Sequence, residues 1–546
     1  MFQASIRHNW IDCASTQFVS CQWTPWRKPT AAIQACPLVL LPWPKTNDSE
    51  ASASSSDDRE TISGTEREIM TKKNEMKTQH YEIGMVGLGV MGRNLVLNMA
   101  DHGFAVAGYD KDVAKVNALR QEAGQRDARG AGDIKEFIAL LRRPRTVMML
   151  VPAGAPVDSV IKDLLPHSEM GDLIIDAGNS YFKDTDVRAR NLTVKGIHFL
   201  GVGVSGGEEG ARRGPSIMPG GPQEAYERVR PVLEAASAKV NDAPCVTWLG
   251  PGSAGHFVKM VHNGIEYGIM QLIAETYDLM KRGWGMNDDE AHEIYASWNK
   301  GELNGYLVEI TSHIFSKQDE KTGKRLIDEI LNVAQQNGTG LWSSQSAMEL
   351  QVPIPTIDLA VAMRDMSVFT KEREQASGMY QRAIRRLAGD RDKFLAQLGR
   401  ALLSAMITIY AQGFALMAVA SGKYKYNLDL EAVARIWRGG CIIRAALLED
   451  ICAAFRVRRD LPNLLLDPNL SRKVMEHQED LRQIVCQAVE SGVPAPAFMV
   501  SLGYLDAYRS AWQPANLIQA QRDYFGSHTY ERIDAKGTFH TQWEKA

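Results

Sequence analysis

A short stretch of the chain places five polar side chains at helical spacing. They are Lys259, His262, Asn263, Glu266 and Tyr267. Side chains spaced in this way lie on one stripe of a helix, and apolar residues here occupy a separate stripe. The polar stripe is either a solvated surface with a Lys–Glu pair or the wall of a site. Gly264 favours a site, because glycine inside a helix costs about 1 kcal/mol and is typical of a position that something approaches closely.

This stripe carries the groups that hydride transfer from a hydroxy acid requires. A base must take the hydroxyl proton as hydride leaves the same carbon, and Lys259 can do so if burial lowers the pKa of its amine. Glu266, two turns further along, can act as the acid, and the two titrations are coupled if both groups share one pocket. His262 and Asn263 can orient the substrate. We therefore predict a nicotinamide-dependent oxidoreductase.

A glycine-rich turn that could hold the nucleotide stands upstream. It follows an apolar run, precedes a helical run and has an acidic residue about 20 positions later, which is the context of a dinucleotide-binding fingerprint. Gly87 permits the tight turn, Gly89 lets the backbone approach the pyrophosphate, and Gly92 allows close helix packing. We predict cofactor contacts from all six residues of the turn: Gly87, Leu88, Gly89, Val90, Met91 and Gly92.

Two residues after the second predicted strand bear on the choice of nucleotide. Asp110 can accept hydrogen bonds from the adenosine ribose hydroxyls and would repel a 2′-phosphate, which favours NAD. Lys111 could pair with such a phosphate, so NADP stays open. The simpler alternative for Lys111 is a solvated loop cation.

Two polar groups follow later predicted strands. Ligands of open parallel sheets collect beyond the carboxyl ends of the strands. Asn179 follows one such strand, and Ser205, Gly206 and Gly207 follow the next. The serine hydroxyl and the glycine N–H groups could hold an anion such as a substrate carboxylate. The alternative is a glycine-rich connection without a ligand.

These residues need a sheet and a helical framework to position them. Five short apolar runs alternate with helical stretches, which indicates a parallel, doubly wound sheet buried on both faces. The runs are Ile83–Val86, Ala105–Tyr109, Val147–Val151, Leu173–Asp176 and His198–Val202. Helical periodicity then continues from about Pro251 to Ser510. The predicted fold is an α/β Rossmann-like doubly wound domain, then a large all-α domain and an extended C-terminal tail.

We divide the chain into four parts. Residues 1–80 contain a polar run and are expected to be a disordered extension, or to precede the true start of the protein. Residues 81–252 form the NAD(P)-binding Rossmann domain and residues 253–510 the helical domain. Residues 511–546 are rich in aromatic and polar residues, and because such a tail often needs a partner to pack against, we expect it to reach the partner subunit.

The composition of the chain narrows the class of protein. Its 546 residues are 45% hydrophobic and 23% charged, as in a multidomain globular protein. The net charge of −3 gives no reason to expect nucleic acid or an anionic membrane as a partner. Seven irregularly spaced cysteines indicate a reducing compartment and no zinc site. With apolar runs far shorter than about 18 residues, we expect a soluble cytoplasmic protein without a metal.

Five segments together resemble the decarboxylating 6-phosphogluconate dehydrogenases, and the resemblance runs from about Tyr81 to Trp543. The segments are Gly87–Gly92, Gly206–Arg212, Lys259–Tyr267, Trp437–Arg444 and Gln519–Gly526. The resemblance implies oxidation of 6-phospho-D-gluconate at its 3-hydroxyl with reduction of NAD(P)+. The 3-keto acid then loses CO2, and protonation of the enediol gives D-ribulose 5-phosphate. This is a reaction of the pentose phosphate pathway, and it needs no metal.

The resemblance also implies a role for individual residues. Lys259 matches the general base, which later acts as an acid, and Glu266 matches the group that protonates the enediol. Val151 and Asn179 are expected to contact the cofactor, and Arg364 the substrate phosphate. Other expected substrate contacts are Asn179, Ser205, Gly206, Gly207, His262, Asn263 and Tyr267. Members of the family are homodimers, so Arg522 and His528 in the tail would complete the partner's phosphate pocket.

The chain departs from the family pattern at two places. The family usually has a phosphate-binding lysine where Asn337 precedes Gly338. Loss of that charge-assisted contact, typically about 1.5 to 3 kcal/mol, predicts weaker phosphate binding. NADP-using members carry Asn-Arg-Thr where this chain has Asp110, Lys111 and Asp112. The second departure again favours NAD.

Two other functions stay open at this point. A non-decarboxylating 3-hydroxyacid dehydrogenase would share the nucleotide domain and the helix lysine, but the retained Arg522 and His528 disfavour it. A catalytically silent nucleotide-binding protein would be expected to have lost Lys259 or Glu266, and both are present.

Overall fold

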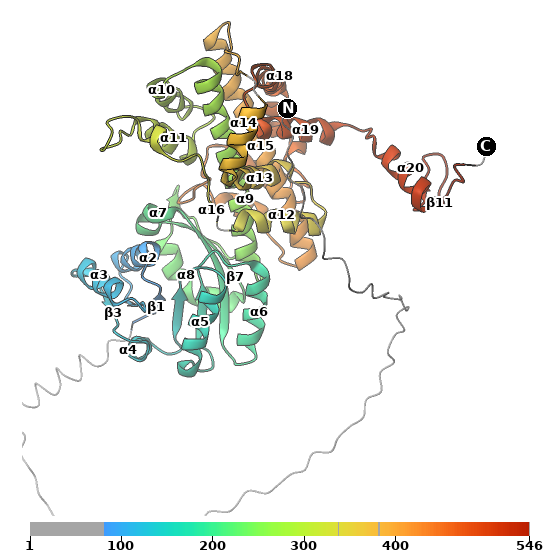
Figure 1. The fold of residues 1–546 in the computed structure, drawn as a ribbon. Coiled ribbons are helices and arrows are strands. Elements are labelled where there is room, and N and C mark those ends of the chain that lie inside the picture. Colours follow the sequence, from blue (N-terminus) through green and yellow to red (C-terminus); the bar gives the residue numbers. More distant parts are fainter. Residues whose placement is uncertain (1–80, 337, 381–382, 545–546) are drawn as a thin grey trace, which may run out of the picture. The chain divides into compact units, whose positions relative to one another are not determined.

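The computed structural model describes residues 81–336, 338–380 and 383–544 (Figure 1). The expectations for residues 1–80 and for Asn337 lie outside the described residues.

A seven-stranded sheet organises residues 81–250, in the order β3-β2-β1-β4-β5-β6-β7 (Figure 1). All neighbouring strands are parallel except β6 and β7, which are antiparallel. The strands are β1 Ile83–Val86, β2 Val106–Tyr109, β3 Ala128–Gly130, β4 Thr146–Met149, β5 Leu173–Asp176, β6 His198–Ser205 and β7 Ser216–Gly220. This topology confirms the predicted doubly wound fold, because the chain leaves β1 toward one edge and returns beside it at β4.

The two edge strands, β3 and β7, were not among the predicted strands. β3 has only three residues, and β7 contains Pro219 and ends at Gly220. Neither carries the apolar run that marks a central parallel strand, and proline is tolerated in a sheet at its edge. The five predicted strands match β1, β2, β4, β5 and β6, with small differences at their ends.

Helices cover both faces of this sheet. Consecutive strand residues such as Met85 and Val86 point to opposite faces and belong to different hydrophobic clusters. The central strands are therefore apolar on both faces. α2, α3 and α8 pack on one face, and α4, α5 and α6 on the other. Their bounds are α2 Val90–Asp101, α3 Val113–Ala123, α4 Ile134–Leu140, α5 Ala155–Leu164, α6 Phe182–Thr193 and α8 Gln223–Ala236. The short helices η1 Leu165–His167 and α7 Gly207–Arg213 and the hairpin β8 Lys239–Val240 and β9 Ala243–Pro244 complete this region.

A long helix, α9, joins the sheet to the helical region. It runs from Ala254 to Asp278 and packs against β6 and β7 as well as α12, α13 and α15. The other helical elements are η2 Leu279–Trp284, α10 Asp288–Trp298, α11 Tyr306–Ser316, η3 Leu326–Glu329, α12 Thr339–Leu350, α13 Pro355–Val368, α14 Thr370–Met379, α15 Arg391–Tyr424, α16 Leu430–Ile436, α17 Leu447–Val457, η4 Leu464–Leu466, α18 Pro468–Ser491 and α19 Pro496–Arg509. The buried apolar side chains of α9 belong to the hydrophobic cluster of the helical region, and α9 brings that cluster against the sheet at β6 and β7.

α15 is long and apolar enough to cross a membrane, with a mean hydropathy of 1.8 over its most apolar window. However, 83% of that window is buried inside the protein, where α15 packs against α9, α18 and α19. Its apolar surface thus faces other helices, and α15 is the central core helix of this region.

Glu275, near the end of α9, is a buried carboxylate that caps another helix. Its oxygens accept hydrogen bonds from the N–H groups of Ala497 and Phe498 at the start of α19. Burial raises the pKa of Glu275 to about 7, although these bonds oppose the shift. The Glu275 carboxyl therefore binds its proton more tightly in the folded protein than in the unfolded chain. Its contribution to the free energy of unfolding is fully present below about pH 4.5 and is lost as pH rises through 7.

We therefore expect Glu275→Gln, which cannot ionise, to differ from the wild type in the pH dependence of Tm. The variant should be less stable than the wild type at pH 5, and the gap should narrow by pH 8. Thermal unfolding followed by circular dichroism measures both values, with the exposed Glu293→Gln as the matched control. A gap that stays constant from pH 5 to pH 8 would contradict this explanation.

The tail is more ordered than the sequence suggested. It forms α20 Ala515–Gly526 and a hairpin of β10 Tyr530–Glu531 and β11 Thr538–Phe539. The Asp523 carboxylate joins helix and hairpin by accepting hydrogen bonds from the N–H groups of Thr529 and Thr541, the Trp543 indole and the His540 ring. Although burial opposes ionisation, these bonds lower the pKa of Asp523 to about 2. This pattern was not visible in the sequence, because it needs the fold-back of the hairpin.

Candidate active site

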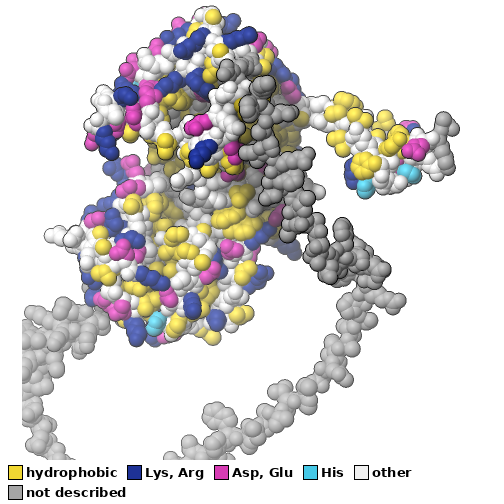
Figure 2. Space-filling model, viewed as in Figure 1, with side chains coloured by type: hydrophobic (Ala, Val, Ile, Leu, Met, Phe, Trp, Pro, Cys, Tyr) yellow, Lys and Arg dark blue, Asp and Glu magenta, His cyan; other side chains and the backbone are white. Residues whose placement is uncertain are grey.

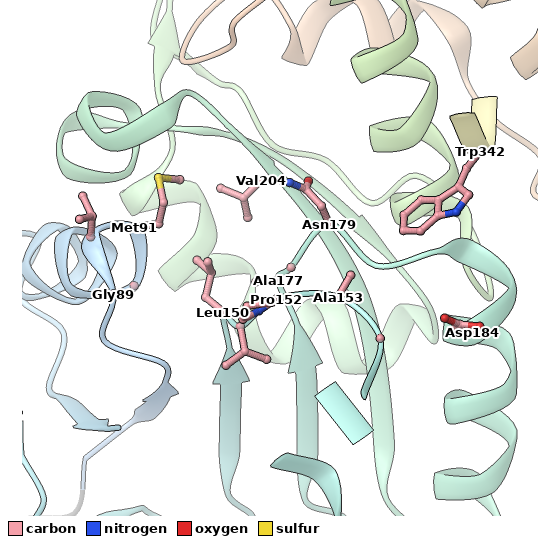
Figure 3. A pocket seen from close by; sticks show the side chains of 15 residues that line it. Gly89, Met91, Leu150, Pro152, Ala153, Ala177, Asn179, Asp184, Val204 and Trp342 are labelled. Atoms are coloured by element: carbon pink, nitrogen blue, oxygen red, sulfur yellow. The ribbon is translucent and has the colours of Figure 1, made fainter. Parts of the chain in front are cut away.

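The loops after β1, β4 and β5 surround a cavity of about 760 Å³ (Figure 3). Gly89 and Met91 come from the first loop and the start of α2, Val151 from the second, and Asn179 from the third. Trp342 of α12 closes the opposite side, so the helical region contributes to the cavity wall. The cavity lies at the carboxyl ends of the strands, where dinucleotides bind to this kind of sheet.

The three glycines of the turn are required in different ways. Gly87 has a φ of +96°, and a Cβ there would lie 2.5 Å from the Leu150 carbonyl oxygen. A Cβ on Gly92 would lie 1.9 Å from the Gly87 carbonyl oxygen, so helix and turn could not pack as closely. Gly89 has no atom within 4 Å of its Cβ position, which leaves open space in the cavity wall. These positions fit the roles predicted for a pyrophosphate-binding turn.

A second cavity of about 550 Å³ lies beside β2 and contains Asp110 and Lys111 in its lining. Both Asp110 oxygens accept hydrogen bonds from the backbone, Oδ2 from Leu88 at 2.8 Å and Oδ1 from Asp112 at 2.9 Å. Asp110 therefore also fixes the glycine-rich turn to the end of β2. Lys111 pairs with Asp163 of α5 at 2.8 Å.

Lys115 of α3, which the sequence analysis did not single out, adds a cation to this second cavity. It lines the cavity, and its Nζ lies 3.7 Å from Asp110 Oδ2. Its position one helical turn after the Asp110 loop could have suggested it. The adenosine end of the predicted site thus holds two lysines and two carboxylates.

Most of the polar stripe of α9 is buried, and Glu266 is its one partly exposed member, with a side chain 20% exposed. Lys259 is 5% exposed and His262 is fully enclosed, and Asn263 and Tyr267 are also buried. Lys259 packs on β6, because a Cβ on Gly203 would lie 2.3 Å from the Lys259 Cβ. Gly203 precedes Val204, which lines the large cavity. The alternative of a solvated helix surface is therefore wrong.

Burial shifts the titration of three groups on this stripe. It lowers the pKa of Lys259, although Glu266 opposes the shift. It also lowers the pKa of His262 well below its usual range, and the Lys259 charge adds to this effect. Burial raises the pKa of Glu266, against the nearby charges of Lys259 and Arg364. A neutral amine and a protonated carboxyl are thus both favoured here, as acid–base chemistry requires.

His262 connects the stripe to the neighbouring elements. Its Nδ1 lies 3.4 Å from Lys259 Nζ and 3.0 Å from Asn263 Oδ1, and its Nε2 lies 3.1 Å from Ser205 Oγ at the end of β6. The Asn263 amide donates to Thr339 Oγ1 at 3.0 Å. Lys259, His262 and Asn263 of α9 and Ser205 of β6 are therefore one hydrogen-bonded group.

The approach that Gly264 suggested comes from other helices. A Cβ on Gly264 would lie 3.0 Å from Ser343 Oγ of α12 and 3.2 Å from Ile357 Cγ2 of α13. Gly264 therefore reflects helix packing. This packing also brings Thr339, at the start of α12, to Asn263.

The glycines after β6 adopt a backbone that favours glycine. Gly206 has a φ of +130° and Gly207 a φ of +62°. A Cβ on Gly206 would lie 2.6 Å from the Gly440 carbonyl oxygen, so the loop after α16 packs directly on it. Gly207 is exposed, which leaves its backbone accessible.

Arg364 of α13 lies beside the far end of the stripe. Its guanidinium is 3.5 Å from the centre of the Tyr267 ring, and it contributes to the electrostatics of Glu266. A fixed cation at this end is what an anionic substrate needs. The structure therefore brings Arg364 together with the α9 residues, as the sequence analysis expected.

Arg522 and His528 are not brought to this group. Both are exposed in the tail, where Arg522 donates to Gln519 and the His528 ring contacts Phe525. Among the described residues, the hydrogen bonds and ion pairs of side chains from Ala515 onward stay within the tail. Because Asn337 is not described, weaker phosphate binding stays a prediction.

No group of three or more His, Cys, Asp or Glu residues in the described ranges is placed to hold a metal ion.

Family models match most of the chain. The NAD binding domain of 6-phosphogluconate dehydrogenase matches residues 82–250, and the 6-phosphogluconate dehydrogenase C-terminal domain matches residues 255–543.

Curated relatives match over nearly their whole length. A Bacillus subtilis protein, described as an NADP(+)-dependent, decarboxylating 6-phosphogluconate dehydrogenase, is 51% identical and covers 85% of this chain and 99% of its own. The decarboxylating enzyme of Escherichia coli is 46% identical, with the same coverage. The solved 6-phosphogluconate dehydrogenase of Plasmodium falciparum, studied without ligands, with NADP+ and with 6-phosphogluconate, superimposes with a TM-score of 0.82 at 42% identity, covering 85% of this chain and all of its own.

A doubly wound sheet with a glycine-rich turn, joined to a helix that buries a lysine and a histidine beside a partly exposed glutamate, defines a dinucleotide-dependent dehydrogenase. The similarity to the relatives is more specific than that class. This chain belongs to the family of decarboxylating 6-phosphogluconate dehydrogenases. This result decides against the non-decarboxylating dehydrogenase left open by the sequence.

Proposed function

We propose that the protein oxidises 6-phospho-D-gluconate with NAD(P)+ and releases CO2 and D-ribulose 5-phosphate. The observation that carries this proposal is the α9 stripe of buried Lys259 and His262 and partly exposed Glu266, which packs on β6 beside the dinucleotide cavity in a chain of this family. A dinucleotide held by the turn at Gly87–Gly92 and by Val151 and Asn179 supplies the hydride acceptor. Four free cysteines among the described residues suit a reducing compartment, which supports a cytoplasmic location.

Lys259 acts as the base in the first step. Because burial lowers the pKa of its amine, a neutral Nζ is available to take the proton of the substrate 3-hydroxyl. The ammonium formed there then donates a hydrogen bond to the new keto oxygen. That bond stabilises the negative charge that develops as the carboxylate leaves as CO2.

Glu266 acts as the acid in the last step. Burial raises the pKa of its carboxyl, so that it holds a proton to give to C1 of the enediol. His262 and Asn263 position the substrate with Ser205 and the N–H groups of Gly206 and Gly207. Arg364 and Tyr267 hold the phosphate end, since the guanidinium lies over the ring.

The direct test of this function is release of CO2 from 6-phosphogluconate by the purified protein, run in parallel with NAD and NADP. CO2 and reduced dinucleotide should form in equal amounts. Reduction of the dinucleotide without CO2 would contradict decarboxylation, and no reaction with either dinucleotide would contradict the proposed function.

For the nucleotide, we propose that NAD is preferred over NADP. Asp110 is held at the end of β2 by two backbone N–H groups, where its charge would repel a 2′-phosphate. Both lysines of this cavity already face carboxylates, Lys111 that of Asp163 at 2.8 Å and Lys115 that of Asp110 at 3.7 Å, which leaves less of their charge for a 2′-phosphate. We expect kcat/KM for NAD to exceed that for NADP. A preference for NADP of roughly tenfold or more, about 1.4 kcal/mol, would contradict this interpretation.

For the assembly, we propose a homodimer in which the tail of one subunit completes the site of the other. Residues 81–252, 253–510 and 511–546 then serve as nucleotide domain, substrate and dimerisation domain, and tail. Hydrophobic side chains gather on the tail (Figure 2), including Leu517, Ile518 and Phe525, which are 59–73% exposed. Apolar exposure of this extent is typical of a surface that a partner covers. Arg522 and His528 would reach the partner's phosphate pocket.

Subunit mixing tests this arrangement. Lys259→Ala and Arg522→Ala should each be poorly active alone. A mixed dimer has one complete site if the tail acts on the partner, because that site combines Lys259 of one subunit with Arg522 of the other. Denaturing and refolding the two variants together should then restore activity at low substrate concentration. If the tail acted on its own subunit, both sites of the mixed dimer would be defective and mixing would restore nothing.

A further inference from the structure

A buried thiol that the proposed mechanism does not use lies against the catalytic group. Cys441, in the loop after α16, is fully buried, and its Sγ lies 2.8 Å from His262 Nε2. The same loop contributes Trp437, whose ring packs edge-on against the His262 ring at 5.5 Å between centres. The loop therefore contacts the imidazole in two ways, through the Trp437 ring and through the thiol at Nε2.

The neighbours of Nε2 are groups that can donate a hydrogen bond. Burial raises the pKa of the Cys441 thiol to about 12, so the thiol keeps its proton. Burial also keeps the pKa of His262 well below its usual range, so the ring is neutral and carries one N–H. The Ser205 hydroxyl, 3.1 Å from Nε2, is the other candidate donor, and its oxygen accepts from the Ile442 N–H at 3.3 Å.

The neighbours of Nδ1 are suited to accept a hydrogen bond. Asn263 Oδ1 lies at 3.0 Å, in the amide orientation in which the NH2 group donates to Thr339 Oγ1. Glu266 Oε2 lies at 3.7 Å and Lys259 Nζ at 3.4 Å. A neutral imidazole that accepts at Nε2 carries its proton on Nδ1, where it meets these acceptors.

We infer that Cys441 is a positioning residue, whose thiol donates to His262 Nε2 and so fixes the imidazole proton on Nδ1, the nitrogen that faces Lys259. This inference rests on the proposed role of Lys259 as base. An Nδ1–H bonded to Asn263 Oδ1 at 3.0 Å, with Nζ 3.4 Å from the same nitrogen, leaves no lone pair there to accept from the Lys259 ammonium and so favours the neutral amine. With the thiol as the donor to Nε2, the Ser205 hydroxyl, which also hydrogen-bonds the thiol, is not required there and can turn to the substrate.

Other charged and titratable groups near this cluster come from three helices. Glu266 shares α9 with Lys259, Arg364 of α13 acts on Glu266, and Tyr410 of α15 lies near Cys441. A change at Cys441 leaves all three side chains in place, so their effects are common to every variant compared below.

The test is the pH profile of kcat/KM for 6-phosphogluconate in Cys441→Ala, Cys441→Ser and Cys452→Ala. Without the thiol, the proton can move to Nε2, and the Nδ1 lone pair can accept from the Lys259 ammonium, which raises the pKa of this base. The acid limb, which is the fall of kcat/KM at low pH, should therefore move up by about one pH unit, equivalent to about 1.4 kcal/mol. At a pH below this limb, kcat/KM of Cys441→Ala should be about tenfold lower than that of the wild type. Cys441→Ser keeps a donor and should restore the wild-type limb. Cys452, equally buried but on α17, is the matched control and should not move it.

An acid limb that stays in place in Cys441→Ala would overturn the inference, since Ser205 would then suffice as the donor. An equal shift in Cys441→Ser would overturn it too, because the effect would be one of packing alone. Neither result concerns the proposed function, which fails separately if the wild-type protein releases no CO2 from 6-phosphogluconate.

Discussion

Lys259→Ala should lower kcat for oxidation of 6-phosphogluconate by about 10²- to 10⁴-fold, the usual contribution of a positioned general base. Burial lowers the pKa of this amine, which suits it to take the hydroxyl proton, and Lys259 packs on Gly203, next to Val204 of the cavity wall. Dinucleotide binding should be unchanged, because the glycine-rich turn lies between β1 and the first turn of α2, away from α9. Reduced dinucleotide is followed by absorbance, CO2 by trapping, and dinucleotide affinity by calorimetry.

The matched control is Lys183→Ala on α6, where the exposed lysine pairs with Glu349. This variant removes the same number of atoms and the same charge outside the site, and it should keep wild-type kcat. If Lys259→Ala retained more than about a tenth of wild-type activity, a different group would have to be the base.

Glu266→Gln should separate the chemical steps. Oxidation and decarboxylation precede protonation of the enediol, so the first turnover should still yield reduced dinucleotide, one per site, in a rapid burst. Later turnovers then wait for slow protonation, and steady-state kcat should fall by about 10²-fold or more. Stopped-flow absorbance measures the burst and the steady rate in one experiment.

The pH profile adds a second measurement for the same variant. Burial raises the pKa of Glu266, and the carboxyl can donate only below that pKa, so wild-type kcat should fall as pH rises through it. Glu266→Gln should lose this limb. Glu275→Gln, a buried glutamate on the same helix that caps α19, should keep it and show no burst. A slow first turnover in Glu266→Gln would show that the residue acts before decarboxylation.

Much of the fold could be predicted from the sequence, because apolar strand runs and the glycine-rich turn depend only on residues that are close together in the chain. The central strands have apolar residues on both faces, so Ile83–Val86 and Leu173–Asp176 could be recognised without a structure. The glycine-rich turn was also visible, since its steric requirements arise within a few residues. The edge strands β3 and β7 and the tail helix α20 lack such local signals.

The sequence determined which side chains share a face of α9, because helical spacing alone places Lys259, His262 and Glu266 on one stripe. Whether that stripe is buried was decided only by tertiary structure. β6, α12, α13 and the Cys441 loop enclose it, and desolvation by these distant segments shifts the pKa of each group. Spacing along a helix is a local property, whereas solvent exclusion depends on residues that are far apart in the chain and meet only in the folded protein.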